Sequence, residues 1–469
     1  MKMVYQVEDK PKFGQILVFA FQQLLAILAA TIAVPMIIGN GMSVASALFG
    51  AGVGTLIYVL FTKAKSPVFL GSSFAFLGSM GAAFAGAISN AAGFAGLILG
   101  AVMAGLVYVV IALVVKFAGV GWINKLMPPV VIGPTVALIG LSLAGNAVGD
   151  LQKGSFLKGV EKWVIADNGL PEKIVEQVPT ANVFVALICG LVTLVVVTLC
   201  STYGKKMTKL IPFIIGILAG YAVAAVFTII GILTDNPLLM VINFEPIKAL
   251  WADGISLSTF ISVPEFTFVK AFKGVKGIDG GYIATIAMAY IPVAFVVFAE
   301  HVADHKNISS IIERDLLDQP GLHRTLLGDG IGSMVGAFFG GCPNTTYGES
   351  VACVAITRNA SVVTIITTAC MAIIAAFVAP IVAFLGSIPS CVMGGVCMSL
   401  YGFIAVSGLK MLQPVDLNKN RNLFVASVIL IAGIGGLSLT FGKVTITTIA
   451  TALILGIIMN LILSKEKAE

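Results

Sequence analysis

Long apolar runs alternate with short polar runs along almost the whole chain. A helix needs roughly 17–25 mostly apolar residues to cross about 30 Å of hydrocarbon. Twelve runs are long enough, at residues 14–38, 42–61, 92–115, 128–148, 182–200, 210–233, 281–303, 324–341, 361–385, 388–408, 422–441 and 444–463. The pattern predicts an all-α polytopic membrane protein.

Two further apolar stretches, residues 67–80 and 342–356, are short and interrupted. Each has a proline followed four or five residues later by a glycine, Gly71 in the first and Gly348 in the second. Proline cannot continue a helix from before it, glycine lets the chain bend, and the Val, Phe, Thr and Tyr between them favour extended backbone. We therefore expect each stretch to form a short strand that leads into a half-helix, with the two strands able to pair at the membrane midplane.

Counting both broken stretches as crossings gives fourteen segments, and matching segments are seven apart. The fifth and twelfth segments, 128–148 and 388–408, both contain a proline, four further residues and a glycine near their start, and the broken stretches are the third and tenth. Because seven is odd, the second copy is inverted in the membrane, an arrangement that transporters use. The sequence thus predicts two inverted seven-segment repeats, residues 1–233 and 281–469, joined by an extracellular loop over 234–280.

The positions of the basic residues indicate the orientation. With both termini in the cytoplasm, 19 of the 28 Lys and Arg fall on the cytoplasmic side. Eight of the other nine lie in two long loops, 149–181 and 234–280, and the positive-inside rule is weak for long loops. We expect a multi-pass protein of the cell inner membrane with both termini in the cytoplasm.

The composition excludes several function classes. The chain is 58% hydrophobic and 11% charged, about half the charged fraction of a soluble protein. Its net charge of +6 therefore reflects membrane orientation, and we expect no nucleic-acid partner. The seven cysteines lie in apolar stretches without paired spacing, so they are interpreted as small core residues, with no metal site and no cofactor. We find no nucleophile or cofactor constellation that would indicate an enzyme.

Two carboxylates at membrane depth are the clearest functional candidates, Glu300 in VVFAEHVADH and Glu349 in PNTTYGESVA. An ionisable residue inside the membrane costs a few kcal/mol or more to insert, so it is a functional candidate by default. No Lys or Arg lies at the depth of Glu349 to form a structural ion pair with it.

Other ionisable residues near this depth have simpler interpretations. Asp304 is one turn after Glu300 on the same helix face, and Asp329 lies in LLGDGIGS. Both are close to the basic cytoplasmic edge, where a buried ion pair or a helix cap is the simpler explanation. For His301 and His305, which share another face, we expect an interfacial position.

The residues around Glu349 indicate the chemistry of a ligand. A ligand bound by two carboxylates should offer N–H donors, and one that faces exposed helix N–H groups should offer carbonyl acceptors. Tyr347 and Phe74 add aromatic faces. Pyrimidine and purine bases are small planar molecules with both donors and acceptors on their edges.

Six segments carry a family resemblance: FQQLLAILAATIAVPMIIG from Phe21, PVFLGSSFAF from Pro67, FAEH from Phe298, GLHRTLLGDG from Gly321, PNTTYGE from Pro343 and MGGVCMSLYG from Met393. On these segments, which span nearly the whole length, the chain resembles the nucleobase–ascorbate (nucleobase:cation symporter) family. It is most similar to the bacterial uracil permeases of that family, and PNTTYGE is the most specific match.

The resemblance implies a core domain, approximately residues 14–119 and 281–385, and a gate domain, approximately 128–233 and 388–463. It places short strands in the third and tenth of fourteen segments. It also implies a proton-coupled symporter that imports a nucleobase, with uracil the expected substrate and protons the second partner. The oligomeric state is left open, with a homodimer among the options.

The resemblance also assigns residues to roles. The substrate would be bound by Glu300, Glu349, Phe74, Gly348, Tyr347, Tyr401 and Gln22, with Gln23 as the neighbour of Gln22 in a polar pair; Phe74 and Gly348 would act through their backbones. From the cost of an ionised carboxylate at membrane depth, and not from the resemblance, we expect proton coupling at Glu300, with Asp304 one turn away.

Departures from the family pattern leave alternatives open. Uracil permeases often have a histidine four residues after the first glutamate, where this chain has Asp304, so a sodium ion remains an alternative coupling ion. The family pattern Glu-Asn-x-Gly is replaced here by Glu349-Ser350-Val351-Ala352, which keeps a xanthine or urate permease open. An inorganic anion exchanger shares the seven-plus-seven plan, but two central carboxylates argue against it, and the lack of a continuous polar stripe argues against a channel.

Overall fold

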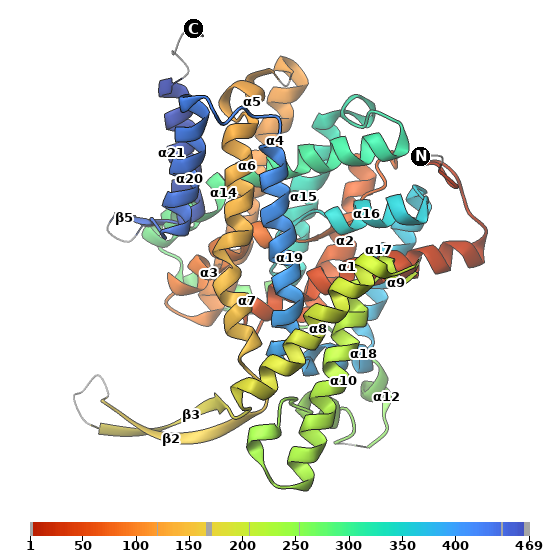
Figure 1. Cartoon of the computed structure of the whole chain (residues 1–469), viewed down its shortest axis with the longest axis vertical. Coiled ribbons are helices and arrows are strands. Elements are labelled where there is room, and N and C mark those ends of the chain that lie inside the picture. Colours follow the sequence, from red (N-terminus) through yellow and green to blue (C-terminus); the bar gives the residue numbers. More distant parts are fainter. Residues whose placement is uncertain are drawn as a thin grey trace. The chain divides into compact units, whose positions relative to one another are not determined.

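The structure is a computed structural model that describes residues 3–119, 121–165, 171–205, 207–252, 254–441 and 444–463. Within these ranges the chain is mostly helical (Figure 1). Eight of the described helices are long and apolar enough to cross a membrane: Phe13–Ile38 (α1), Val44–Phe61 (α2), Asn90–Ala118 (α4), Pro129–Leu151 (α6 and α7), Val183–Tyr203 (α8), Pro212–Leu233 (α10), Gly280–Ile312 (α14) and Ser390–Met411 (α19). The chain is thus a multi-pass, mostly helical membrane protein, as the hydrophobic pattern predicts.

The other long apolar runs also contain helices, which are shorter or less apolar. They are α15 (Leu322–Gly340), α17 (Val362–Phe377), α18 (Ala379–Ser387), α20 (Asn420–Ile434) and α21 (Thr448–Leu463). Fourteen crossings in two inverted repeats therefore remain a prediction. Of the charges used for the orientation, Lys2, Lys206, Lys443, Lys465 and Lys467 lie outside the described residues.

The chain forms two compact units. The first contains the residues up to Leu143, Val263–Val378 and the residues from Leu400, and the second contains Ala144–Ser262 and Ala379–Ser399. The core and gate domains expected from the sequence have other boundaries than these two units and remain a prediction.

Glycines allow close helix packing in the first unit. A Cβ on Gly50 of α2 would collide with the carbonyl oxygen of Gly336 in α15. A Cβ on Gly54, one turn further along, would lie 2.8 Å from the carbonyl oxygen of Gly332. Small residues at such spacing let two membrane helices approach backbone to backbone. The close packing of α15 on α2 helps to position the strand at Asn344–Thr346, which follows α15 in the sequence.

The two broken stretches form a short antiparallel sheet in the first unit. Strand β1 (Leu70–Ser72) pairs with β4 (Asn344–Thr346), with Gly71 opposite Thr345. After β1 come a single turn of 3₁₀-helix (Phe74–Phe76, η1) and α3 (Leu77–Ala85). After β4 comes α16 (Gly348–Thr357). Each stretch thus passes from extended backbone into a helix shorter than a membrane span.

The first unit also contains two C-terminal helices and several short elements. Helices α20 and α21 lie side by side (Figure 1), with the strands Leu439–Phe441 (β5) and Val444–Ile446 (β6) between them in sequence. The short elements are α5 (Gly121–Leu126), α13 (Thr267–Phe272), the 3₁₀ turn Val275–Gly277 and the π-helical turn Leu317–Gly321.

The second unit is built on α8 and α10, which pack through small residues. A Cβ on Gly220 of α10 would collide with the hydroxyl of Thr193 in α8. Its other elements are α7 (Ala144–Leu151), β2 (Leu157–Ile165), β3 (Pro171–Pro179), α9 (Met207–Leu210), the 3₁₀ turn Pro237–Leu239, α11 (Glu245–Ala249), α12 (Leu257–Phe260), α18 and the start of α19. Strands β2 and β3 form a nine-residue antiparallel pair (Figure 1) within the run that the sequence analysis treats as a loop.

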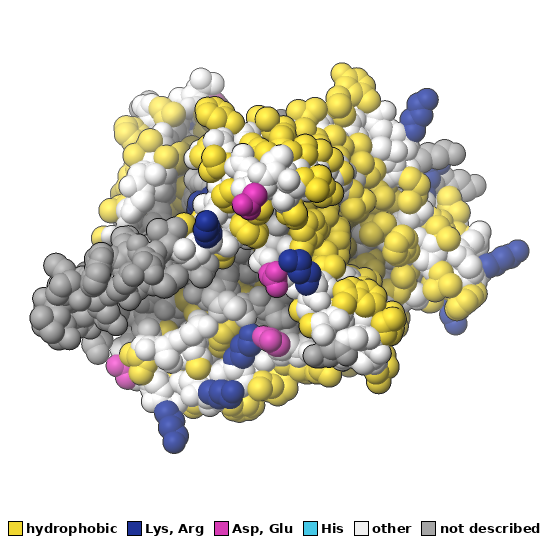
Figure 2. Space-filling model, turned by 90° about the horizontal axis from the view of Figure 1, so that it is seen from below, with side chains coloured by type: hydrophobic (Ala, Val, Ile, Leu, Met, Phe, Trp, Pro, Cys, Tyr) yellow, Lys and Arg dark blue, Asp and Glu magenta, His cyan; other side chains and the backbone are white. Residues whose placement is uncertain are grey.

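Large apolar side chains point outward from the long helices. The exposed residues of α8 include Phe184, Ile188, Leu191, Val195 and Leu199, at helical spacing. The opposite face buries small or polar residues such as Cys189, Gly190 and Thr193. Yellow apolar side chains also gather over the upper centre and right of the face seen in Figure 2, whereas Lys, Arg, Asp and Glu lie across its middle and along its rim. A surface of this kind requires lipid as its solvent.

Candidate substrate site

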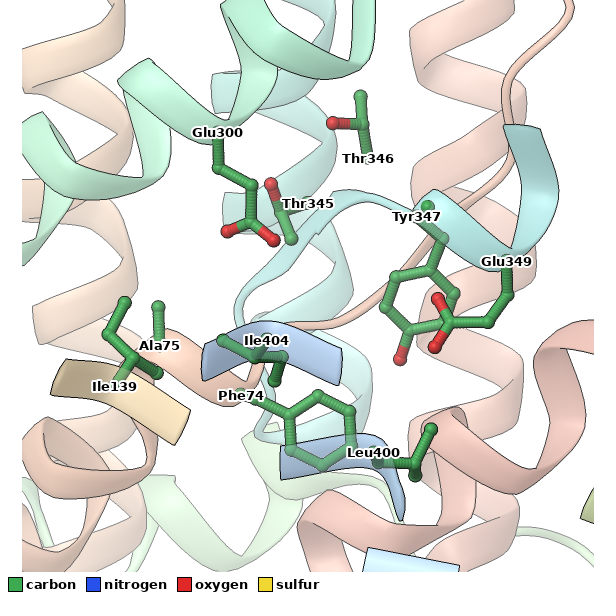
Figure 3. A pocket seen from close by; sticks show the side chains of 11 residues that line it. Phe74, Ala75, Ile139, Glu300, Thr345, Thr346, Tyr347, Glu349, Leu400 and Ile404 are labelled. Atoms are coloured by element: carbon green, nitrogen blue, oxygen red, sulfur yellow. The ribbon is translucent and has the colours of Figure 1, made fainter. Parts of the chain in front are cut away.

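A small cavity lies in the first unit beside the paired strands (Figure 3). Its volume is about 50 Å³, several times the roughly 10–15 Å³ that one water needs. It is lined by Phe74, Ala75, Ile139, Glu300, Thr345, Thr346, Tyr347, Gly348, Glu349, Leu400 and Ile404. Two half-buried carboxylates, Glu300 and Glu349, line the cavity together with the phenol of Tyr347. No described Lys or Arg lines it.

The first turn of α16 positions Glu349. Tyr347 is the residue before the helix and has extended backbone angles, and Gly348 and Glu349 are its first two residues. The first N–H groups of a helix have no partner inside it and carry the positive end of the helix dipole. A Cβ on Gly348 would meet nothing within 4 Å, so the backbone here is open to the cavity. This end of α16 can therefore offer both a carboxylate and N–H donors to a ligand.

Glu300 enters the cavity from α14. Its side chain lines the cavity together with that of Glu349, which enters from α16 (Figure 3). Asp304, one turn after Glu300, accepts a hydrogen bond of 2.8 Å from the hydroxyl of Thr346. Asp304 does not line the cavity, and its bond to β4 ties α14 to the paired strands.

Aromatic rings form another part of the lining. The Phe74 ring packs edge to face against Tyr401 of α19, with 5.8 Å between the ring centroids. The Tyr347 hydroxyl donates to the carbonyl oxygen of Ser72 at 2.7 Å. A Cβ on Gly71 would collide with the Tyr347 ring, so only glycine fits beneath this ring without displacing it.

The glutamine pair of α1 lies outside the cavity lining. Gln23 donates to the hydroxyl of Ser350 at 2.6 Å, and the same hydroxyl accepts from the backbone N–H of Phe69 at 3.0 Å. Gln23 thus braces α16 against the start of β1. Gln22 is also buried.

Of the proposed substrate-binding residues, five line one cavity: Glu300, Glu349, Phe74, Gly348 and Tyr347. Tyr401 supports the Phe74 ring from outside the lining. Residues that the sequence analysis did not select also line it, namely Ala75, Ile139, Thr345, Thr346, Leu400 and Ile404. The threonines stand in the PNTTYGE motif, and Leu400 and Ile404 are one helical turn apart, but neither signal indicates a cavity by itself.

The interfacial position expected for His301 and His305 is wrong, because both side chains are completely buried. His301 Nδ1 lies 2.7 Å from Oδ2 of Asp329, which is itself 1% exposed. His305 Nε2 lies 2.7 Å from the hydroxyl of Tyr58. Asp329 therefore belongs to a buried pair, the simpler of its two interpretations, and the histidines are buried because these partners satisfy their nitrogens.

The described residues contain no group of three or more His, Cys, Asp or Glu side chains that could hold a metal ion. The chemistry on offer in the cavity is hydrogen bonding: two carboxylates, hydroxyls, helix N–H groups and aromatic faces around a space of molecular size.

Comparison with known proteins places the chain in a family. The sequence profile of the Permease family matches residues 14–442. The chain belongs to the Permease family. Members bearing that name are transporters, so this permease is a transporter and not an enzyme.

Curated relatives match the permease over nearly its full length. The uracil permease of Bacillus caldolyticus is 38% identical over 98% of this chain and 95% of its own. The uracil permease of Bacillus subtilis (strain 168) is 37% identical over 99% of this chain and 96% of its own. That of Escherichia coli (strain K12) is 34% identical over 97% and 93%.

Solved structures share the fold of the permease at low sequence identity. The transmembrane domain of the cyanobacterial bicarbonate transporter BicA is 15% identical, with a TM-score of 0.60, over 97% of this chain and 100% of that one. The murine anion transporter Slc26a9 in its inward-facing state is 14% identical, with a TM-score of 0.61, over 97% of this chain and 69% of that one. The fold is therefore one found in transporters.

Proposed function

We propose that this permease imports uracil together with a proton across the cell inner membrane, with both termini in the cytoplasm. The relatives that match nearly the whole chain are named uracil permeases. The observation that carries the proposal is the pair of carboxylates, Glu300 and Glu349, in one cavity with the open N-terminus of α16.

The chemistry of the cavity matches the edge of a pyrimidine base. Uracil has two ring N–H groups, which carboxylates accept, and two carbonyl oxygens, which backbone N–H groups can bind. We assign the N–H groups to Glu300 and Glu349, and one carbonyl oxygen to the backbone at Gly348. The backbone of Phe74 provides a further contact, and Tyr347, with Tyr401 and Gln22 behind the lining, shapes the site.

Proton coupling in this proposal belongs to Glu300, with Asp304 next to it on α14. An ionised carboxylate is expensive at membrane depth, so movement of the loaded site is favoured when Glu300 carries a proton. Fourteen crossings in two inverted repeats, with a core and a gate domain, provide the framework for alternating access. A xanthine or urate substrate remains the alternative.

Proteoliposomes containing the purified permease test this function. Labelled uracil should accumulate under an inwardly directed proton gradient, accumulation should collapse with a protonophore, and excess xanthine should compete poorly. Glu300→Gln, which resembles the neutral acid, should retain uracil exchange but lose the proton that Glu300 contributes to gradient-driven accumulation. Accumulation that needs sodium and ignores the protonophore would overturn the proton assignment, and competition by xanthine at equal concentration would overturn the choice of uracil.

A further inference from the structure

A second polar cluster lies in the first unit, and none of its members lines the substrate cavity. It connects α14 with α15 and α2 through side chains that are fully or almost fully buried. Its members are His301, His305, Thr325, Asp329, Tyr58 and Ser66. The rings of His301 and His305 stack with 4.0 Å between their centroids.

The hydrogen bonds of His301 determine where its protons lie. The Thr325 hydroxyl donates its one hydrogen to the carbonyl oxygen of Leu322 at 3.0 Å. It must therefore accept at its other contact, 3.0 Å from His301 Nε2, so Nε2 carries a hydrogen. A neutral imidazole with its hydrogen on Nε2 presents only a lone pair at Nδ1.

Nδ1 nevertheless lies 2.7 Å from Oδ2 of Asp329. A lone pair facing an ionised carboxylate oxygen would repel it, so a further proton must lie between these two atoms. The pair is then either imidazolium with carboxylate or imidazole with carboxylic acid. Both forms are neutral overall, and both hold one proton more than a neutral imidazole beside an ionised carboxylate.

No described Lys or Arg faces the pair to balance the charge that would remain if this proton were lost. The titratable groups that face it from neighbouring elements are Glu300, Asp304 and His305 on α14, Tyr108 on α4 and Tyr58 on α2. None of them is a Lys or Arg. Loss of the proton would leave a buried negative charge next to two other carboxyl groups, which is unfavourable unless the protein changes conformation or another proton arrives.

The other oxygen of Asp329 provides a route for the proton. Oδ1 has no hydrogen-bond partner among the described residues. Asp329 lines a second cavity of about 10 Å³ together with Tyr108, Ser333 and Asn344, roughly the 10–15 Å³ that one water occupies. Water that enters this space from an opened conformation could accept the proton from the pair and return it.

We propose that the His301–Asp329 pair is a second proton-binding site of the transport cycle, separate from the substrate cavity. The pair takes up one proton and releases it to water in the cavity at Asp329, and no other bond is made or broken. His301 directly follows Glu300 on α14, so a change in the pair alters the helix that carries the substrate carboxylate. This inference rests on proton-coupled uracil transport.

Asp329→Asn is the sharpest functional test. The amide NH₂ can donate to His301 Nδ1, which reproduces the loaded pair without an exchangeable proton. Uracil counterflow, which needs no gradient, should persist. Gradient-driven transport should use one proton fewer per uracil, which lowers the accumulation ratio about tenfold for each unit of pH difference. Asp318→Asn, in the exposed connection between α14 and α15, is the matched control and should behave as wild type.

An Asp329→Asn permease with the proton stoichiometry and pH profile of the wild type would overturn the inference, because the pair would then be only structural. Absence of uracil counterflow in the wild type would instead overturn the proposed function. Nitrogen-15 NMR of histidine-labelled permease tests the proton itself, even if Asp329→Asn does not fold. His301 should show a proton on Nε2 and a strongly hydrogen-bonded Nδ1, and a neutral ring protonated only on Nδ1 would overturn the inference.

Discussion

At the scale of single residues, neighbouring carboxylates differ in what satisfies them. Asp304 already accepts a bond from Thr346 at 2.8 Å, and Asp329 is bound by His301. Glu300 and Glu349 instead face the cavity, where a ligand can meet them. A carboxylate with internal partners is held by the protein, whereas one that faces the substrate cavity is available to bind substrate, and this difference separates the four acids more clearly than their depth does.

Glu349→Gln tests whether a carboxylate that faces the cavity binds the substrate. The substitution turns one acceptor oxygen into an NH₂ donor, which would face a ring N–H of the base. Loss of a charge-assisted hydrogen bond costs roughly 1.5–3 kcal/mol, so uracil should bind about tenfold or more weakly in calorimetry of the detergent-solubilised permease. Glu245→Gln, on the exposed helix α11, is the control. Near-normal uracil affinity of Glu349→Gln would remove Glu349 from the binding site.

At the scale of elements, the paired strands hold the site together although each has only three residues. β1 brings Gly71 under the Tyr347 ring, and β4 leads directly into the first turn of α16. The hydroxyl of Tyr347 is fixed on the carbonyl oxygen of Ser72, so the ring cannot easily move away from Gly71. The position of one glycine therefore determines the position of a cavity wall.

Gly71→Ala should consequently displace Tyr347. The new methyl group would need space that the ring now occupies, and relief would come from a shift of the ring into the cavity or from separation of the strands. Uracil binding and the melting temperature in detergent should both fall. Gly78→Ala, on the exposed side of α3 where a Cβ meets nothing within 4 Å, should leave both unchanged or raise stability slightly. Wild-type binding by Gly71→Ala would show that the ring is not confined.

The sequence predicts these elements unevenly. The backbone of the broken stretches was predictable because proline and glycine act locally, and the structure has strands at Leu70–Ser72 and Asn344–Thr346. Strands β2 and β3 were missed, although Asn168 and Gly169, a common hairpin-turn pair, lie between them and outside the described residues. The His301–Asp329 pair was not predictable, because its partners are 28 residues apart and only tertiary packing brings them together.

At the scale of the whole molecule, the first unit connects parts that are far apart in sequence through its N-terminal segment. The N–H of Val4 donates to the carbonyl oxygen of Arg358, and that of Val362 donates to the carbonyl oxygen of Val7. Val7, 1% exposed, packs in a core cluster with residues of α2, α14, α16 and α17. The segment before α1 therefore joins the connection between α16 and α17, which begins at the end of the helix that carries Glu349.

An ion pair closes this arrangement. Arg314, just after α14, donates to both carboxylate oxygens of Glu8, at 2.6 and 2.8 Å. The hydrogen bond from Arg314 lowers the pKa of Glu8 below its usual 4.5. A carboxyl group with a lowered pKa in the folded state stabilises that state above its unfolded pKa, and the contribution is lost as the pH falls through the folded pKa.

A double-mutant cycle with Glu8→Gln and Arg314→Gln should therefore give a coupling that depends on pH. Both side chains are about half exposed, so the coupling should be only about 0.2–1 kcal/mol. It should be complete at pH 7 and fade as the pH falls below 4.5, the usual pKa of Glu8, when thermal unfolding is followed in detergent. High salt should weaken it, because partly exposed charges are screened. The cycle with Glu265→Gln and Arg314→Gln, whose side chains form no ion pair with each other among the described residues, should give no coupling. A coupling that is equal at pH 7 and pH 3.5 would show that Glu8 and Arg314 interact through packing and not through charge.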